Sequence, residues 1–442
     1  MMASARDLAA VRRSALPLRR PGDLGPLLDR VGDARLVLLG EASHGTSEFY
    51  RWRAELTRRL VAERGFSFVG VEGDWPDCHR VHCSVVGSPG APTDPREALA
   101  DFVRWPRWMW ANEEVVDFAR WLRDYNDGLA PQRRVGFHGL DVYSLFESLR
   151  AVLGYLAEHE PDHLPAAREA LRCFEPYGGD PRSYALASRL VPEGCEAEVV
   201  TLLRELRETV FSPQAEAGAL DERFIAEQNA EAAADAERYY RAMVRGGPES
   251  WNVRDCHMAD TLDRLLRRYS AGAHGPASKA VVWEHNTHIG DARATDMAAA
   301  GMVNLGQLAR ERHGRDDVVL VGFGTHRGTV IASERWAGQV RRMTVPPARP
   351  GSLEALLHEA TGGGDAAFIL PTDGDGWSQA VLDHRAIGVV YHPESERRSN
   401  YVPTVLARRY DAFLYCDHTD ALRPLHPIEL PDTEPEAYPS GQ

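Results

Sequence analysis

Short apolar runs alternate with longer helical patterns along the chain, and this alternation is the strongest constraint on its fold. Stretches of ten or more residues with apolar positions at helical spacing separate most of the runs. Such an alternation favours a mainly parallel sheet covered by helices. We therefore predict an α/β fold with a mainly parallel sheet flanked by helices. The strand-like runs are RLVLLGE at 35, FSFVGVE at 66, RVGFHGLD at 134, KAVVWEH at 279, VVLVGFG at 318 and AIGVVYH at 386.

The stretch 143–269 contains no convincing strand. Its apolar residues recur at i, i+3 and i+4, the spacing of amphipathic helices. This pattern predicts a helical insertion subdomain that roofs the cleft of the α/β core. The core itself is expected to comprise 33–142 and 270–426, with terminal extensions at 1–32 and 427–442.

Composition and charge limit the classes of function. Hydrophobic residues make up 43% and charged residues 26% of the 442 residues, which is typical of a globular protein. No apolar run approaches the ~18 residues of a membrane-spanning helix. The N-terminus lacks the apolar region of a signal peptide, so we expect a cytoplasmic protein with no membrane partner. The formal charge of −14 disfavours nucleic-acid binding.

Cysteine spacing gives no sign of a structural framework. The chain has no C-x-x-C pair. Scattered cysteines favour reduced, buried thiols over disulfides or a zinc ribbon. The six are Cys78, Cys83, Cys173, Cys195, Cys256 and Cys416.

Titratable side chains follow the predicted strands. Because the carboxyl ends of parallel strands share one edge, these side chains are expected to converge on one crevice. Any single acid at such a position has the alternative role of capping the next helix. Several such positions with two histidines favour a functional site. The residues are Glu41, Glu72, Asp141, Glu284 with His285, and His392.

The segment after the first strand places an acid beside a base. Glu41 precedes His44 by three residues, and histidine, with a pKa of ~6.5, suits proton transfer near neutral pH. We expect Glu41 to orient the imidazole. Arg53 lies nine residues beyond His44, and if it reaches the site it can bind an oxyanion or a substrate carboxylate.

Ser43 is not expected to be a nucleophile. The elbow motif G-x-S-x-G needs glycine two residues before the serine, whereas Gly40 stands three residues before it. We interpret Ser43 as the N-cap of a helix that begins near Thr46.

His285 and His288 have H-x-x-H spacing, which places both imidazoles on one side of a helical turn or tight loop. That spacing alone is weak evidence for a metal. With Glu41, His44 and Glu72 close by, the donor set would suit zinc or manganese. A divalent metal therefore stays open as an alternative.

Three tryptophans, Trp105, Trp108 and Trp110, belong either to the core or to the wall of a cleft for a ring-shaped substrate. Together with the helical stretch they predict a large apolar cleft, which would favour bulky lactones over short esters.

Seven blocks of the chain resemble successive motifs of the erythromycin esterase family. They are LLGEASHGTSEFY, VEGDWPDCHRV, WPRWMWANEEVVDFARWLRDYN, FHGLDVYSL, SWNVRDCHMADTL, VVWEHNTHIGDAR and VVYHPESERRSNYV. The resemblance spans roughly 33–426. It implies an α/β core with a helical subdomain at the cleft, and hydrolysis of a macrolactone by a histidine-activated water with no covalent intermediate and no required metal. It also implies that the cleft is lined by Glu41, His44, Arg53, Glu72, His285 and His288.

The chain departs from the macrolide-resistance members of that family after His44, where GTSEF replaces a bulkier apolar step. The resemblance therefore supports the catalytic class more than the substrate. We predict a hydrolase of a small-molecule ester or lactone without metal or cofactor. The expected catalytic residues are His44, Glu41, Glu72, His285 and His288, and the expected substrate-binding residues are Arg53, Trp105, Trp108 and Trp110.

Two alternatives use the same residues. The first is a metal-dependent hydrolase or lyase in which they are ligands, and the second is a non-catalytic protein that binds a small molecule. Neither the natural substrate nor the oligomeric state follows from the sequence.

Overall fold

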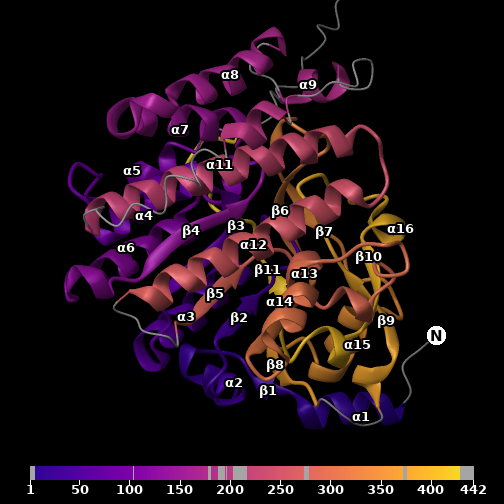
Figure 1. Cartoon of the computed structure of the whole chain (residues 1–442). Helices are drawn as coiled ribbons and strands as arrows, with labels where there is room; N and C mark the ends of the chain where they lie inside the picture. The colour runs from indigo at the N-terminus through magenta and orange to yellow at the C-terminus, as the bar shows by residue number, and fades with distance from the viewer. Residues whose placement is uncertain are drawn as a thin grey trace, which may run out of the picture.

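A large sheet with helices on both faces forms the centre of the structure (Figure 1). Its strand order is β1-β8-β11-β6-β2-β5-β3-β4, and β7 pairs with β6. The strands from β11 to β4 run parallel, whereas β1, β7 and β8 pair antiparallel with their neighbours. The predicted α/β fold with a mainly parallel sheet is confirmed. The computed structural model describes residues 5–102, 104–177, 181–187, 195, 197–202, 217–272, 278–371 and 376–428.

The strand bounds show which predicted runs enter the sheet. The main sheet consists of β1 (Leu16–Pro17), β2 (Leu36–Leu39), β3 (Phe68–Asp74), β4 (Gly136–Asp141), β5 (Ala280–Trp283), β6 (Val318–Ser333), β7 (Val340–Val345), β8 (Ala366–Ile369) and β11 (Ala412–Thr419). A separate two-stranded sheet consists of β9 (Val381–Arg385) and β10 (Tyr401–Val405).

The prediction of a strand at 386 is wrong. This segment makes only isolated bridges, in which Ile387 pairs with Ser43 and Val390 with Ser333. The Ile387 N–H donates to the Ala42 carbonyl, so the segment braces the loop after β2 instead of joining the sheet. The sixth parallel strand is β11, whose apolar run AFLYC continues into polar residues.

Both faces of the sheet are buried, which explains the unbroken apolar runs of its strands. In β2, Val37 and Leu39 belong to one core and Leu36 and Leu38 to the other. This division follows from the alternation of side chains along a strand. The first core is built with α3 (Ser47–Arg64), α4 (Trp75–Val86), α5 (Pro95–Ala100) and α6 (Glu113–Asp127), and the second with α12 (Glu249–Ala271), α14 (Leu305–His313), α15 (Leu353–Thr361) and α17 (Leu406–Arg409).

A group of helices beyond one end of the sheet has its own core (Figure 1). Over the described part of 143–269 the chain is helical and contains no strand. The long α11 packs against both α7 and α12, which joins this group to the helices that cover the sheet. The group consists of α7 (Leu145–His159), α8 (Leu164–Phe174), α9 (Pro181–Ala187) and α11 (Ala217–Met243).

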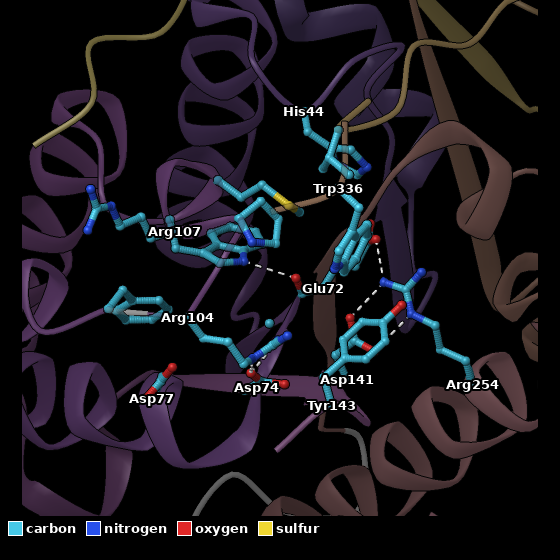
Figure 2. A pocket seen from close by; sticks show the side chains of 16 residues that line it. His44, Glu72, Asp74, Asp77, Arg104, Arg107, Asp141, Tyr143, Arg254 and Trp336 are labelled. Carbon is cyan, nitrogen blue, oxygen red and sulfur yellow. Dashed lines mark hydrogen bonds and ion pairs between the residues drawn. The ribbon is translucent and has the colours of Figure 1, made fainter. Parts of the chain in front are cut away.

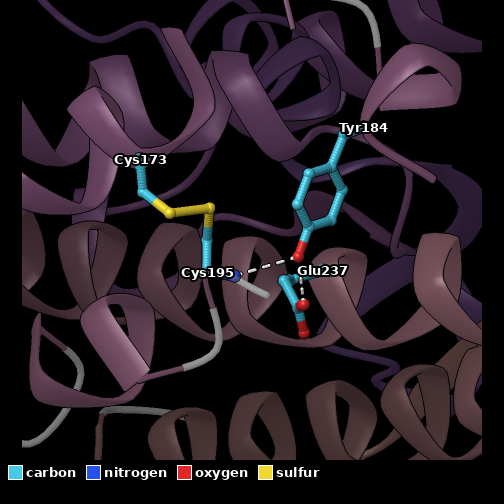
Figure 3. Close-up of a disulfide and its surroundings, with 4 residues drawn as sticks. All are labelled: Cys173, Tyr184, Cys195 and Glu237. Carbon is cyan, nitrogen blue, oxygen red and sulfur yellow. Dashed lines mark hydrogen bonds between the residues drawn. A yellow bond between two sulfur atoms is a disulfide. The ribbon is translucent and has the colours of Figure 1, made fainter. Parts of the chain in front are cut away.

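Cys173 and Cys195 form a disulfide in this helical group, so the prediction of six reduced thiols is wrong for these two (Figure 3). The bond joins the end of α8 to a residue 22 positions further along the chain. The Cys195 N–H donates to the Tyr184 hydroxyl at 3.0 Å, and that hydroxyl donates to Glu237 on α11. The other four cysteines are free.

The N-terminal segment expected to be an extension lies within the α/β core. α1 (Ala5–Ser14) packs against α15, β1 pairs with β8, and α2 (Gly25–Val31) contributes Leu27, Leu28 and Val31 to the first core. The tail expected at 427–442 lies outside the described residues from 429 onward. Among the described helices, none has the length and apolar composition needed to cross a bilayer.

The loop with the H-x-x-H pair is fixed to the sheet by one asparagine. This loop forms a short helix, α13 (Asn286–Ile289). Its Asn286 amide donates to the Phe323 carbonyl of β6 at 2.7 Å and accepts from the Phe323 N–H at 3.2 Å. Gly40 allows this approach, because a Cβ there would lie 2.1 Å from Asn286 Oδ1.

We expect Gly40→Ala to lower the free energy of unfolding by about 1–3 kcal/mol, since the added methyl group displaces the asparagine that anchors the loop. Gly154→Ala is the matched control. Gly154 lies in α7, and a Cβ added there would have nothing within 4 Å, so alanine is expected to raise stability by about 0.5–1 kcal/mol. Urea unfolding measures both changes, and equal effects of the two substitutions would contradict the anchoring role.

Candidate active site

Acidic residues from four adjacent parallel strands meet at one edge of the sheet. Glu41 follows β2, Glu284 follows β5, Glu72 lies in β3 and Asp141 ends β4. Each side chain is buried, with at most 4% of the residue exposed. The expected convergence of strand-end acids is therefore observed for these four. His392 does not join them, because its side chain is 45% exposed and its contact is with Glu394.

Glu41 holds His44 on one side and Arg53 on the other. Its Oε1 lies 2.8 Å from His44 Nδ1, and its Oε2 accepts from Arg53 Nη2 at 2.7 Å. The carboxylate fixes the tautomer in which Nδ1 carries the proton, and this leaves the lone pair on Nε2. His44 is 8% exposed and lines a cavity.

Arg53 lies behind Glu41 and does not line that cavity. It is fully buried, and its guanidinium stacks over the ring of Tyr50 at 4.1 Å and that of Trp283 at 5.2 Å. Ser43 is also placed differently from the prediction. Its hydroxyl bonds with Thr46, and the helix begins at Ser47 with no side-chain cap, so Ser43 is not the N-cap.

Arg254 on α12 binds Glu72 and Asp141 (Figure 2) and also His288. It donates to both oxygens of Asp141, to Glu72 Oε1 at 2.6 Å and to His288 Nε2 at 3.0 Å. The other oxygen of Glu72 accepts from the His285 N–H at 2.8 Å. One guanidinium thus ties together the ends of β3, β4 and the loop after β5.

The H-x-x-H pair uses three of its four ring nitrogens in hydrogen bonds. His288 Nδ1 lies 3.0 Å from both oxygens of Asp255, and its Nε2 accepts from Arg254. His285 Nδ1 accepts from the Thr287 N–H. The His285 ring also packs on that of His44, with centroids 4.8 Å apart.

These contacts do not fit a metal centre. In the described part of the chain, no three His, Cys, Asp or Glu side chains are arranged to hold a metal ion. A cation bound at His288 Nε2 would have to displace the guanidinium of Arg254, whose charge repels it.

Charge and burial divide the histidines of the site. Burial lowers the pKa of His44, but the charge of Glu72 and the hydrogen bond and charge of Glu41 outweigh it, so the pKa is raised. Burial and the neighbouring His44 hold the pKa of His285 well below its usual range. His44 is therefore the ring that can accept and hold a proton, while His285 stays neutral.

The acids of the site also differ in the direction of their pKa shifts. Burial opposes ionisation of Glu72, but the neighbouring His288, the charge of Arg254 and the neighbouring His44 outweigh it and lower its pKa. Burial and the charge of Glu72 raise the pKa of Glu284 well above its usual range. Neither oxygen of Glu284 has a hydrogen-bond partner among the described residues, which fits a neutral carboxyl group.

A cavity of about 90 Å³ lies beside this cluster (Figure 2). Eight of the sixteen described lining residues are aspartate, glutamate, arginine or histidine, so the cavity is more highly charged than the large apolar cleft that the tryptophans predict. The described lining residues are His44, Glu72, Gly73, Asp74, Asp77, Phe102, Arg104, Pro106, Arg107, Met109, Trp110, Asp141, Tyr143, Arg254, Trp336 and Val389.

The three predicted tryptophans lie at different depths in this wall. Trp110 lines the cavity, and its indole N–H donates to the Glu72 carbonyl at 2.9 Å. Trp108 is 1% exposed and belongs to the core. Trp105 packs edge-on against Trp108 and against Trp336 of the lining.

Three residues of the site were missed as candidates from the sequence. Arg254 and Asp255 lie side by side in α12, where one helical turn of charged residues reads as a solvated face. Tyr143 follows β4 and stands between two guanidiniums, with Arg104 and Arg254 each 4.9 Å from its ring centre. The only sequence signal was their presence in the blocks that resemble the family.

The fold and this site define a class, namely α/β proteins in which buried carboxylate–histidine pairs end the strands of a parallel sheet beside a charged cavity. The model of the erythromycin esterase family matches residues 61–419. The chain belongs to the erythromycin esterase family.

Individual relatives are distant. The erythromycin esterase type II of Escherichia coli is 29% identical over 120 residues, which cover 27% of this chain and only about a quarter (26%) of that protein's length. A solved succinoglycan biosynthesis protein has a TM-score of 0.76 at 22% identity, covering 95% of this chain and 98% of that one. A histidine-to-asparagine mutant of the erythromycin esterase EreC, in its open conformation, has a TM-score of 0.66 at 18% identity, covering 91% and 95%. At these identities the likeness shows the shared fold.

We expect Glu72→Gln to lower the pKa of His44. Glu72 supplies the largest charge that favours the imidazolium, and without it the charge of Arg254 acts against protonation more strongly. An NMR titration of the His44 ring measures the change. Asp77→Asn, which removes another carboxylate of the cavity wall, is the control and should move the pKa less. A pKa that stays or rises in Glu72→Gln would contradict this electrostatic coupling.

Proposed function

We propose that the protein hydrolyses an ester or lactone with a water molecule activated by His44 and without a covalent intermediate. One observation carries the proposal. The Glu41–His44 pair is built like the acid and base of a catalytic triad, yet the described lining of its cavity contains no serine, threonine or cysteine. Because no such side chain lies beside the base, we assign the role of nucleophile to water.

His44 acts as the general base. Its Nε2 has no hydrogen-bond partner among the described residues, and Glu41 stabilises the imidazolium that forms when this nitrogen takes a proton from water. The oxygen of that water attacks the carbonyl carbon. When the intermediate collapses, the bond between the carbonyl carbon and the leaving oxygen breaks, the alcohol departs, and His44 then gives up its proton to solvent.

Arg254 is the group we assign to the developing oxyanion. It lines the cavity, its charge is fixed, and its contacts with Glu72 and Asp141 hold it without reorganisation. Glu72 has the further role of raising the basicity of His44.

The remaining predicted residues act through these groups. We assign Arg53 to positioning Glu41 in place of binding substrate, because Arg53 is fully buried. His285 and His288 position Glu72 and Arg254, through the His285 N–H and the His288 Nε2. Trp110 is the one tryptophan of the three that we assign to substrate contact.

The cavity favours a compact, polar ester or lactone. Its charged lining would lose hydration against a wholly apolar ring, and such a loss disfavours binding unless the ligand supplies hydrogen bonds. The names of the relatives make macrolactones the first lactones to test, together with smaller polar esters.

We expect His44→Ala to reduce kcat/KM by about 10²–10⁴-fold while the unfolding midpoint stays close to that of the wild type. A screen of lactones and esters for the mass gain of one water provides the substrate for this comparison. The control is His392→Ala, which removes an exposed imidazole and should leave turnover unchanged. Full turnover by folded His44→Ala protein would remove the assignment of the base.

Turnover is expected to survive dialysis against a chelator. Arg254 occupies the position where a cation would meet His288, and the fixed guanidinium charge disfavours a second cation there. Metal analysis of protein purified without chelator, combined with activity before and after dialysis, tests this. Stoichiometric zinc or manganese, with activity lost on removal and regained on its return, would favour the metal-dependent alternative.

A further inference from the structure

Asp74 places a second carboxyl group in the cavity wall that the proposed reaction has not used. It follows Glu72 by two residues, at the end of β3, and only 5% of it is exposed. Its neighbour across the sheet is Asp141 of β4. In the view of Figure 2 Glu72 lies between His44 and Asp74.

Helix capping does not account for Asp74. It stands at the N-cap position of α4, where an aspartate usually accepts a hydrogen bond from a backbone N–H of the first turn. No side-chain cap hydrogen bond is formed. The carboxyl group instead contacts Arg104 through Oδ2, and both residues line the cavity.

One oxygen of Asp74 is left without a partner. Oδ1 is buried and has no hydrogen bond to any described residue. A buried, unpaired oxygen is costly on a carboxylate and much less so on a neutral carboxyl group. Burial raises the pKa of Asp74 to about 7, the charge of Arg104 opposes the rise, and the charges of Asp141 and Asp77 add to it.

We propose that Asp74 is the general acid that protonates the leaving alcohol. This inference rests on the proposed hydrolysis and adds a second catalytic residue to it. When the tetrahedral intermediate collapses, the bond between the carbonyl carbon and the leaving oxygen breaks, and that oxygen takes the proton of the Asp74 carboxyl group. Asp74 becomes a carboxylate while His44 holds the proton of the attacking water. His44 then releases its proton to solvent and Asp74 takes one up, so the net reaction consumes one water.

The proposal gives Asp74 a role that depends on the leaving group. An alkoxide is a poor leaving group and needs a proton as the bond breaks, whereas p-nitrophenolate leaves without one. Ethyl butyrate and p-nitrophenyl butyrate share their acyl group and differ in this requirement. The ratio of their kcat/KM values therefore reports on the acid and is insensitive to the base.

We expect Asp74→Asn to lower kcat/KM for ethyl butyrate by about 10²–10⁴-fold and to change that for p-nitrophenyl butyrate by less than about tenfold. The matched control is Asp77→Asn. Asp77 lies in the same wall and the first turn of the same helix, but it is paired with Arg80 at 2.6 Å. This control keeps the acid and removes only a neighbouring charge that raises the pKa of Asp74, so it should change the ratio of the two rates far less than Asp74→Asn does. Equal losses for both esters in Asp74→Asn, or no loss for either, would overturn the proposal.

Wild-type protein gives an independent test that does not depend on the folding of a variant. The acid form of Asp74 is lost as the pH rises through about 7. Turnover of ethyl butyrate should therefore fall above that pH, and turnover of p-nitrophenyl butyrate should not. A decline shared by both esters, or absent from both, would contradict a role for Asp74.

The His44→Ala variant separates this inference from the proposed function. It is expected to lose activity toward both esters, because both need the activated water. If both activities survive in His44→Ala, the assignment of the base fails, while the ratio measured in Asp74→Asn still decides the role of the acid.

Discussion

The charge of Arg254 is the constraint on which the site depends. Bringing Glu72 and Asp141 together inside the protein would be strongly unfavourable without a buried cation between them. Arg254 meets this need with hydrogen bonds to both carboxylates and uses a further N–H for His288. The ends of β3 and β4 and the loop after β5 therefore have one fixed spacing, set by a planar group with a rigid geometry.

This fixed arrangement separates the pKa values of neighbouring groups. Glu72 stays ionised because three cationic or protonatable groups face it, and its charge in turn raises the pKa of His44. Burial outweighs the charge of Arg104 at Asp74 and is unopposed by any hydrogen bond from a described residue at Glu284, so both have raised pKa values. Acids from adjacent strands are thereby divided into charged and neutral forms at the same pH, which is the condition for a base and an acid to act within one cavity.

Much of the fold and of the site follows from local patterns in the sequence. The runs at 35, 66, 134, 279 and 318 are β2 to β6 because strands buried on both faces carry unbroken apolar residues. The segment at 386 has the same composition, but its backbone finds partners in the loop after β2. Composition cannot distinguish a strand of the sheet from a segment that braces a loop, because both arrangements provide hydrogen-bond partners for the backbone N–H and C=O groups.

The ion pairs of the site could not be predicted from local patterns in the sequence. Arg254 lies 113 residues from Asp141 and 182 from Glu72, so its partners are decided by how α12 crosses the sheet. The Glu41–His44 pair, separated by three residues, could be predicted as a contact. Arg53 shows the limit of spacing along a helix, since it reaches Glu41 from the core side and is held over the rings of Tyr50 and Trp283.

The helical group acts on the cavity through Tyr143. The ring of Tyr143 stands between the guanidiniums of Arg104 and Arg254, and cation–π contacts hold it there. On its other side the Tyr240 hydroxyl of α11 donates to the Tyr143 carbonyl at 3.1 Å, and the Tyr239 ring packs edge-on against that of Tyr143.

The same helix, α11, carries Glu237, which bonds to Tyr184 next to the disulfide (Figure 3). α11 thus connects the core of the helical group to Tyr143. This tyrosine belongs to the cavity wall between Asp74, the proposed acid, and Arg254, the proposed partner of the oxyanion. The helices beyond the sheet set the shape of the cavity by fixing Tyr143, although the charged groups that we assign to the chemistry come from the strand ends, the first turn after β2 and α12.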